Sequence, residues 1–261
     1  MNLSLTGRNA IICGSSQGIG FAIAKELAQM GANCILLARN KEKLTISLSQ
    51  LDTSLQQVHH FFAVDFNDHI ALSKLVEELV KDKPIHILIN NSGGPAAGPV
   101  LSATEDQFLQ AFHQHLLTNH LLTTMVVPTM KEAGFGRVIN IISTSVKIPL
   151  PNLGVSNTIR GSVASWAKTM ANELASFGIT VNNVLPGATK TERLSTIILN
   201  NAQKKNKNPE EIEKEMIAEI PAKKFGEPED VAALAAFLCS PSAGYITGVS
   251  IPVDGGRTGS I

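Results

Sequence analysis

The sequence is poor in cysteine, tyrosine and net charge, and each shortage excludes a class of protein. Its three cysteines, Cys13, Cys34 and Cys239, are scattered beside apolar residues, which argues against a disulfide framework or a CxxC metal site. Free cysteines favour a reducing compartment, so a cytoplasmic location is expected. The 22 basic residues balance 22 acidic residues, which argues against a binder of nucleic acid or anionic membranes. Tyr245 is the single tyrosine.

Long hydrophobic runs are also missing. Residues 1–10 are polar and lead into only a short apolar run, so no secretory signal is expected. The longest stretch without a charged residue, 107–130, contains His113, His115 and His120 and is too polar to cross a bilayer. It predicts instead a helix that is buried in the protein or at a subunit interface.

Short apolar runs alternate with longer helical patterns along the chain. Nearly continuous apolar runs are typical of strands covered on both faces. The predicted strands cover residues 9–13, 33–38, 59–64, 85–90, 137–142, 180–185 and 250–253. Apolar residues recur at helical spacing between them, for example over 155–177 and 228–238. This alternation predicts an α/β fold with a doubly wound parallel sheet of about seven strands, in one domain over 1–261.

One segment, residues 191–224, is more polar than its surroundings. It lies between the sixth predicted strand and the helix that begins at Pro228. Within it, Pro209 can open a short helix with acidic residues in its first turn, which suits the helix dipole. We interpret the segment as a lid or substrate loop inserted into the domain. The alternative is a solvated helical excursion without a role at the site.

A glycine-rich loop follows the first predicted strand. It reads Cys13-Gly14-Ser15-Ser16-Gln17-Gly18-Ile19-Gly20. Glycine permits the tight turn and lets the backbone approach a ligand closely. The helix that follows presents free N–H groups and the positive end of its dipole to a pyrophosphate. Because this loop opens the first strand–helix unit of an alternating chain, it predicts dinucleotide binding.

The spacing of these glycines resembles that of the short-chain dehydrogenase/reductase (SDR) family. Further segments match the family in the same order along essentially the whole chain: Asn90-Asn91-Ser92-Gly93, Asn140-Ile141-Ile142-Ser143, Pro186-Gly187, Tyr245-Ile246-Thr247-Gly248 and Val253-Asp254-Gly255-Gly256. The resemblance implies a single-domain Rossmann fold and an oxidoreductase that uses a nicotinamide dinucleotide and acts on a small-molecule substrate.

The resemblance also implies where the dinucleotide lies. Asp65 would accept a hydrogen bond from the adenine amino group, residues 91–93 would line the adenosine ribose, and Thr189 would hold the nicotinamide amide. The expected cofactor-binding residues are Gly14, Ser15, Ser16, Gln17, Gly18, Ile19, Gly20, Arg39, Asn40, Asp65, Phe66, Asn91, Ser92, Gly93, Arg160, Pro186, Gly187 and Thr189.

The end of the second predicted strand bears on the choice between NAD and NADP. An acidic residue there would bind the ribose 2′-hydroxyl of NAD. The sequence instead reads Ala38-Arg39-Asn40-Lys41, and Arg39 can pair with a 2′-phosphate. NADP is therefore the favoured cofactor, with NAD as the alternative. Gln17 stands where many NADP-dependent relatives have a basic residue, which weakens the preference, and an ordinary solvated Arg39 is the competing interpretation.

The catalytic set of the family is Asn–Ser–Tyr–Lys, and three of its four positions differ here. Ser143 matches the serine. Counting 13 residues further gives Ser156 at the tyrosine position, and four more give Arg160 at the lysine position. Counting back from Pro128 places His115 at the asparagine position. Tyr245 lies in a segment that the resemblance assigns elsewhere, so no realignment supplies the tyrosine.

These replacements change the acid–base chemistry. A serine hydroxyl is a far weaker acid than tyrosine, whereas arginine stays protonated and only donates hydrogen bonds. Ser156 and Arg160 share a helix face, so Arg160 can polarise a carbonyl or hold ribose hydroxyls. His115 is the first candidate for a proton donor and Lys147 the second; each can equally be a structural or solvated side chain. Standard helical geometry separates His113 and His120 by about 10.5 Å along the axis and turns His115 away, so no metal site is expected.

The sequence thus predicts an atypical NADP-dependent oxidoreductase of the SDR type, similar overall to 3-oxoacyl reductases, with Ser143, Ser156, Arg160 and His115 as candidate catalytic residues. The alternatives are a non-redox enzyme on the same scaffold and a dinucleotide-binding pseudoenzyme. By resemblance, the chain is expected to form a homotetramer or homodimer through the helices before and after Ser143.

Overall fold

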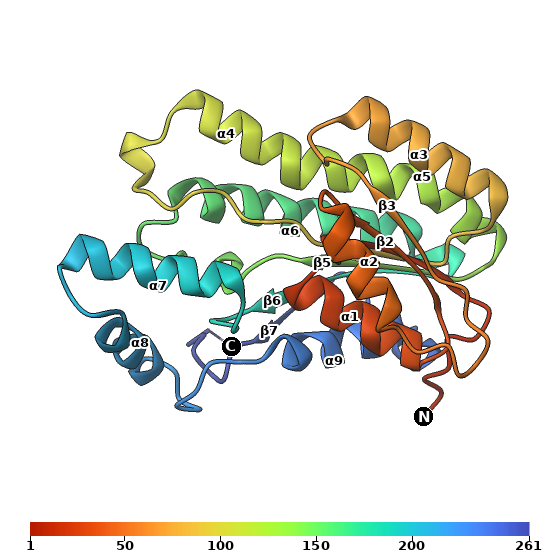
Figure 1. The fold of residues 1–261 in the computed structure, drawn as a ribbon. Helices are drawn as coiled ribbons and strands as arrows, with labels where there is room; N and C mark the ends of the chain where they lie inside the picture. The colour runs from red at the N-terminus through yellow and green to blue at the C-terminus, as the bar shows by residue number, and fades with distance from the viewer. Residues whose placement is uncertain (261) are drawn as a thin grey trace.

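The computed structural model describes residues 1–260, and its centre is one sheet of seven parallel strands (Figure 1). The order across the sheet is β3-β2-β1-β4-β5-β6-β7, so the chain winds outward from β1 in one direction and from β4 in the other. This confirms the predicted fold class. The strands are β1 (Asn9–Cys13), β2 (Asn33–Ala38), β3 (His60–Ala63), β4 (Ile87–Asn90), β5 (Gly136–Ile141), β6 (Ile179–Pro186) and β7 (Ser250–Val253).

The boundaries of β1, β2 and β7 match the sequence-based prediction, and those of the other four strands differ from it by one or two residues. The largest difference is at β4, which was expected from residue 85 and begins at Ile87. Ile85 is buried, but its backbone N–H and carbonyl both bond to the Thr129 hydroxyl, at 3.1 and 3.2 Å. Because these groups are engaged with a helix, Ile85 does not join the strand ladder.

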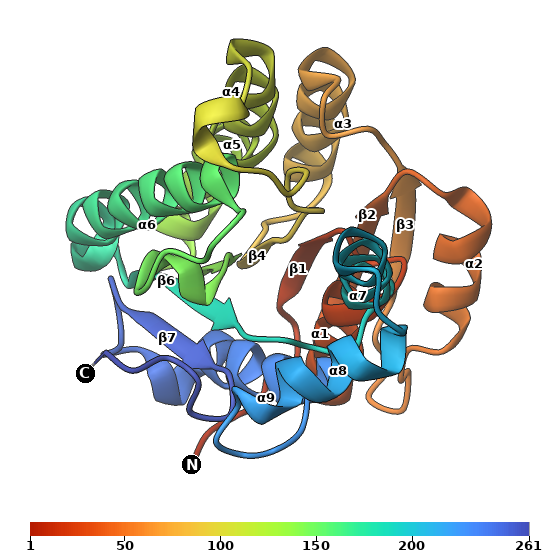
Figure 2. The ribbon, with the colours of Figure 1, turned by 90° about the vertical axis from the view of Figure 1, so that its left-hand side faces the viewer.

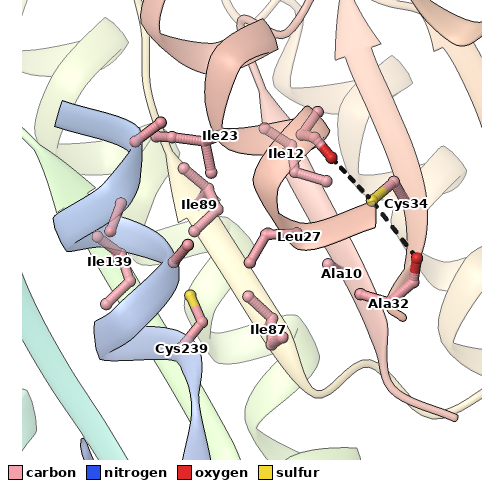
Figure 3. Packing of buried hydrophobic residues seen from close by; sticks show 14 of the residues in the cluster. Ala10, Ile12, Ile23, Leu27, Ala32, Cys34, Ile87, Ile89, Ile139 and Cys239 are labelled. Atoms are coloured by element: carbon pink, nitrogen blue, oxygen red, sulfur yellow. Dashed lines mark hydrogen bonds between the residues drawn. The ribbon is translucent and has the colours of Figure 1, made fainter. Parts of the chain in front are cut away.

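Helices α1 (Gly18–Gln29) and α9 (Pro228–Cys239) cover one face of the sheet, and α2 (Lys41–Ser49) lies beside β2 and β3 (Figure 2). Figure 3 shows the core beneath α1 and α9, where Ile23 and Leu27 meet Ile87 and Ile139 of the sheet. The Cys34 thiol contacts the carbonyls of Ala24 and Ala32, at 3.6 and 3.7 Å. This packing holds α1, and the loop before it, against the sheet.

The three cysteines are buried and free. Burial raises the pKa of the Cys13 and Cys239 thiols to about 12, and it raises that of Cys34 further. Within residues 1–260, no three metal-ligating side chains gather at one place. None of the helices in this part of the chain is both long enough and apolar enough to cross a membrane.

The opposite face is covered by α3 (His69–Asp82), α5 (Thr118–Glu132) and α6 (Gly154–Leu174). Helix α4 (Glu105–Phe112) continues into α5 through one π-helical turn, η2 (His113–Leu117). The sequence predicted an uninterrupted helix over 107–130, so the π turn is a correction. It buries His115, which is 1% exposed, and leaves His113 and His120 exposed. The remaining short helices are 3-10 turns at Val100–Ser102, Thr144–Val146, Ala175–Phe177 and Pro241–Ala243.

The polar segment 191–224 forms two helices that pack on each other, α7 (Glu192–Lys205) and α8 (Pro209–Ala218). Pro209 occupies the first turn of α8 with Glu210 and Glu211, as the sequence predicted. The side chains of Thr191 and Asn208 cap the two helices. Figure 2 views the molecule from the end where α7 and α8 lie, in front of the carboxyl ends of the strands.

Candidate active site

The glycine loop adopts a conformation that other residues would not tolerate. Gly14 and Gly18 have positive φ angles of +59° and +57°. A Cβ atom on Gly14 would lie 2.7 Å from the Asn91 carbonyl, and one on Gly20 would lie 2.3 Å from the Gly14 carbonyl. The loop therefore folds tightly on itself and on the end of β4, and the backbone forms its outer surface.

Helix α1, like α6 and unlike five other helices, has no side-chain cap at its first turn. The side chains of Asn40, Asp68, Thr104, Thr191 and Asn208 cap α2, α3, α4, α7 and α8. Gln17, at the corresponding position of α1, makes no such bond, and the first turn of α1 contains no acidic residue. Its N–H groups are left for an external acceptor, and the dipole favours an anion there.

The side chains of the loop are held outside this surface. The Ser15 hydroxyl donates to the Ile12 carbonyl at 2.8 Å, and Ser47 of α2 donates to the Ser16 carbonyl at 3.1 Å. Ile19 packs on the core. The amide of Asn91 donates to the carbonyls of Cys13 and Gly14, both at 3.2 Å. The cradle therefore presents main-chain groups to a ligand.

The expected adenosine side lies at the ends of β2 and β3. Arg39 is exposed and has no acidic partner among residues 1–260. The Asn40 side chain accepts from the Lys43 N–H at 2.8 Å, so it caps α2. Asp65 is exposed and accepts from the Asn67 N–H at 3.0 Å, while Phe66 is buried. A surface hollow lined by Asp65, His69, Ile70 and His113 adjoins these residues.

The expected nicotinamide side lies at the end of β6. Pro186 is the last residue of that strand, and the Gly187 N–H donates to the Val253 carbonyl of β7 at 2.9 Å. A Cβ on Gly187 would lie 2.6 Å from the Asp254 side chain, so the chain passes close to that residue. Thr189 is buried, and its hydroxyl donates to the Gly187 carbonyl at 3.2 Å.

The four candidate catalytic residues lie on α6, on the π turn η2 and just after β5, and α6 contacts both the π turn and the 3-10 turn that follows Ser143. Ser143 follows β5 and caps the 3-10 turn η3 (Thr144–Val146); its hydroxyl accepts from the Ser145 N–H at 3.1 Å. Ser156 and Arg160 are buried on α6, which contacts both η3 and the π turn that contains His115. The hydroxyl proton of Ser143 remains available, because its oxygen is the acceptor in this turn.

Arg160 is a buried cation with an incomplete set of partners. It is 7% exposed, and its Nη1 donates to the Ile141 carbonyl at 2.9 Å. Its Nε is buried and has no partner within residues 1–260. Burial, together with the charge of Arg193, lowers the pKa of Arg160 to about 10, so the guanidinium stays charged at neutral pH. It can donate to a ligand oxygen or stabilise a developing negative charge.

His115 is neutral at physiological pH. Burial, with the nearby charges of Arg160 and Arg193, lowers the pKa of His115 to about 2. This differs from the sequence-based expectation that His115 would titrate near neutral pH. Its Nδ1 lies 2.9 Å from the Ser92 hydroxyl, and its Nε2 is buried without a partner in the described part of the chain. A neutral imidazole that accepts from Ser92 carries its proton on Nε2 and can donate a hydrogen bond.

Arg193 is a residue that sequence reasoning missed. It is the second residue of α7, and its guanidinium donates to the Gly94 and Pro95 carbonyls at 2.8 and 3.1 Å. These bonds attach α7 to the loop after β4. The only available signal was its place within the polar segment 191–224, which does not reveal its partner.

The second candidate proton donor, Lys147, and the single tyrosine both lie outside the buried cluster. Lys147 is exposed one residue past η3. Tyr245 is fully exposed, in the turn before β7. His113 and His120 are exposed, whereas the π turn directs His115 into the interior, so the three histidines do not share one site.

Known proteins share this fold and its sequence pattern. A family model described as enoyl-(acyl carrier protein) reductase matches residues 14–258. A chloroplastic tropinone reductase homologue from Arabidopsis thaliana is 31% identical over 98% of this chain and 77% of its own length. Dehydrogenase/reductase SDR family member 4 from Sus scrofa is 31% identical over 97% of this chain and 88% of its own. The chain belongs to the short-chain dehydrogenase/reductase family.

Two solved structures are similar over nearly the whole chain. YwfH, an NADPH-dependent reductase of bacilysin biosynthesis, is 30% identical with a TM-score of 0.92 and covers 97% of this chain and 99% of its own. L-sorbose reductase from Gluconobacter frateurii, in complex with NADPH and L-sorbose, is 27% identical with a TM-score of 0.93 and covers 100% of both chains.

Proposed function

We propose that the protein is an NADP-dependent oxidoreductase that interconverts a carbonyl and an alcohol on a small molecule. The observation that carries this proposal is the glycine cradle before α1. Its first turn has no side-chain cap and no acidic residue, Gly14 and Gly20 have no room for a Cβ atom, and the positive φ angle of Gly18 disfavours a side chain there. These residues fit a pyrophosphate group, and family membership supplies the matching activity.

Charge at the end of β2 supports NADP as the favoured cofactor, with NAD as the alternative. Arg39 is exposed without an acidic partner in residues 1–260, and no carboxylate stands between it and Glu42. A 2′-phosphate would complement this arginine. The two solved structures compared above are described with NADPH, which gives further support.

The proposed active site lacks the tyrosine and lysine that the family uses, so this chain's own residues must divide the work differently. NADPH, when bound, supplies the hydride. The Ser143 hydroxyl and the buried Arg160 guanidinium donate to the substrate oxygen and stabilise the negative charge that develops there. Ser156, one helical turn before Arg160 on α6, contributes a further hydroxyl.

The proton for the alcohol product comes through a neutral group. His115 holds a proton at Nε2 when its Nδ1 accepts from Ser92, and burial prevents it from carrying a positive charge. It can therefore give its Nε2 proton to the product oxygen while Nδ1 takes the proton of the Ser92 hydroxyl, which solvent then replaces, so no positive charge forms on the ring.

The proposal extends to the rest of the chain. Residues 1–261 act as one domain, and the segment 191–224 acts as a lid on the substrate side, attached to the loop after β4 by Arg193. The protein acts in the cytoplasm, in keeping with three free buried thiols, and assembles as a homodimer or homotetramer.

The first test is a titration of the protein with NADPH and NADH, followed through the fluorescence of Trp166. We expect micromolar binding of NADPH and weaker binding of NADH. If neither nucleotide binds, the glycine cradle is not a dinucleotide site and the proposed function is wrong.

The second test is NADPH oxidation with a panel of aldehydes and ketones, for the wild type and Ser143→Ala. Turnover that falls strongly in the variant supports the oxidoreductase. Tight NADPH binding without turnover of any carbonyl would instead identify a dinucleotide-binding protein without redox activity.

A further inference from the structure

Three polar side chains join the start of α7 to the glycine loop. The Glu192 carboxylate accepts from Nε2 of Gln17 at 2.7 Å and from Nζ of Lys43 at 3.1 Å. The Lys43 ammonium also donates to Oε1 of Gln17. The three residues come from the loop before α1, from α2 and from α7, and all are exposed. An anion is therefore held between a lysine and an amide donor at the outer edge of the glycine loop.

This cluster lies beside the end of β2. Asn40 caps α2 by accepting from the Lys43 N–H, so Lys43 is placed in the first turn of that helix. Ser47, one turn further along α2, donates to the Ser16 carbonyl and brings the helix onto the glycine loop. Arg39 directly precedes the cap. A dinucleotide on the cradle places its adenosine ribose at this end of β2.

The chemistry of the cluster fits a phosphate better than a carboxylate. A phosphate monoester carries a charge of about −1.5 to −2 and has three acceptor oxygens. The ammonium of Lys43 offers three donors, and the amide of Gln17 offers two. Glu192 supplies a single negative charge from an exposed side chain, and exposed pairs of this kind are weak. A stronger anion that arrives at this position would displace the glutamate.

We propose that Lys43, together with Arg39, binds the 2′-phosphate of NADP, and that Glu192 occupies this phosphate position when the cofactor is not bound. This inference rests on the proposed function. It assigns a specificity role to a lysine on α2 and a competing role to the first residue of α7. Because Arg193 still attaches α7 to Gly94 and Pro95, displacement of Glu192 frees only the adenosine side of this helix.

The test is isothermal titration of the wild type and of Lys43→Gln, Glu192→Gln and the double variant. The ligands are NADPH, NADH and two fragments, adenosine 2′,5′-bisphosphate and 5′-AMP, which differ in the 2′-phosphate. Lys25→Gln is the matched control, because Lys25 forms a similar exposed pair with Glu229 at 3.0 Å on the other side of α1. The Asn40 cap uses the main chain of residue 43, so Lys43→Gln leaves it in place.

We expect Lys43→Gln to lower the affinity for NADPH and for the bisphosphate about tenfold. The affinity for NADH and for 5′-AMP should fall less than about twofold. Glu192→Gln should tighten the two 2′-phosphorylated ligands about threefold, and this gain should vanish in the double variant. The control should behave as the wild type with all four ligands.

The outcomes separate this inference from the proposed function. Suppose the wild type binds NADPH, and Lys43→Gln either weakens the binding of NADPH and NADH equally or changes neither. Lys43 then does not recognise the 2′-phosphate, and the oxidoreductase proposal stands. If Glu192→Gln weakens NADPH, the glutamate covers the cofactor and is not its competitor, so the inference is overturned. If wild type binds neither nucleotide, both proposals are wrong.

Discussion

Two buried arginines stand near opposite ends of β5, and their surroundings are opposite in kind. Arg137, near the start of the strand, donates from Nη1 to the carbonyls of Gly136 and Gly178, at 2.8 and 3.2 Å, and from Nε to that of Ser240, at 3.3 Å. Its guanidinium also lies 4.1 Å from the centre of the Phe135 ring. Arg160, at the end of the strand, has one carbonyl partner and an unpaired Nε.

The difference shows what each charge is for. Neither arginine has a carboxylate partner among residues 1–260. A buried cation that is not compensated is costly, so an arginine that makes several hydrogen bonds to main-chain carbonyls stabilises the fold, whereas one with a single such bond keeps donors for a ligand. We interpret Arg137 as a structural residue and Arg160 as a residue whose remaining donors are available to bind the substrate or the nicotinamide ribose.

Arg137→Met gives the largest expected loss of stability. The variant loses three hydrogen bonds from the guanidinium to main-chain carbonyls, at about 1 kcal/mol each, so the free energy of unfolding should fall by about 3 kcal/mol. Urea unfolding measures this directly. Arg137→Lys keeps a charge and some of the donors and should lose less. A loss below about 1 kcal/mol for Arg137→Met would contradict the structural role.

Arg160→Met should affect activity and spare the fold. Because removal of the charge also removes the cost of burying it, the free energy of unfolding should change by less than about 1 kcal/mol. The value of kcat/KM with NADPH should fall about 100-fold, because a donor to the reacting oxygen is lost. Arg160→Lys serves as the rescue variant. A collapse of stability as large as that of Arg137→Met would erase the distinction between the two arginines.

The histidine beside Arg160 should make the fold sensitive to acid. The pKa of His115 is lowered from 6.5 to about 2, so the unfolded chain takes up a proton that the folded chain excludes. Its contribution to stability is complete above pH 6.5 and declines as the pH falls toward 2, by up to about 1.4 kcal/mol per pH unit.

Thermal unfolding of His115→Gln between pH 7 and 3 tests this effect. The melting temperature of the variant should fall less steeply with acid than that of the wild type. His86→Gln is the comparison at the Arg137 end of the sheet, where burial and Arg8 lower the pKa of His86 to about 4. The effect of His86→Gln on the acid sensitivity of the melting temperature should be confined to the narrower pH interval between 6.5 and 4. Parallel curves for His115→Gln and wild type would show that His115 accepts a proton in the folded protein.

Phe135→Leu gives the smallest expected change. The Phe135 ring faces Arg137 and Arg8, each with its guanidinium carbon 4.1 Å from the ring centre. The loss of these contacts should cost about 1 kcal/mol in urea unfolding. In the background of Arg137→Met, the same substitution should cost less, because one of the two cations is absent. Full additivity would mean that the ring and Arg137 do not interact.

Much of the fold could be predicted because its signals are local. Strands that are covered on both faces have continuous apolar sequences, as in β1 and β4. Gly14 and Gly18 mark turns that need a positive φ angle. The π turn was not predictable in the same way, because it is a single turn within a continuous helical run, and no glycine or proline marks it in His113–Leu117. The start of β4 was misplaced because Ile85 bonds to Thr129, 44 residues away.

The candidate site could be predicted only in outline. The cradle and the four residues Ser143, Ser156, Arg160 and His115 followed from spacing and from the family resemblance. The contacts that determine their behaviour join distant parts of the chain: Ser92 with His115, Arg193 with Gly94, and Glu192 with Lys43. The neutral state of His115 likewise depends on burial, which no local pattern reports.

The burial of Cys13, Cys34 and Cys239 has a practical consequence for experiments in solution. Because all three thiols are enclosed and resist ionisation, thiol-directed dyes should leave the native protein unlabelled. One cysteine introduced on the outer surface of α7 would then carry the only fluorophore. The position of that helix could be followed by fluorescence through a nucleotide titration, with every native residue of the core left in place.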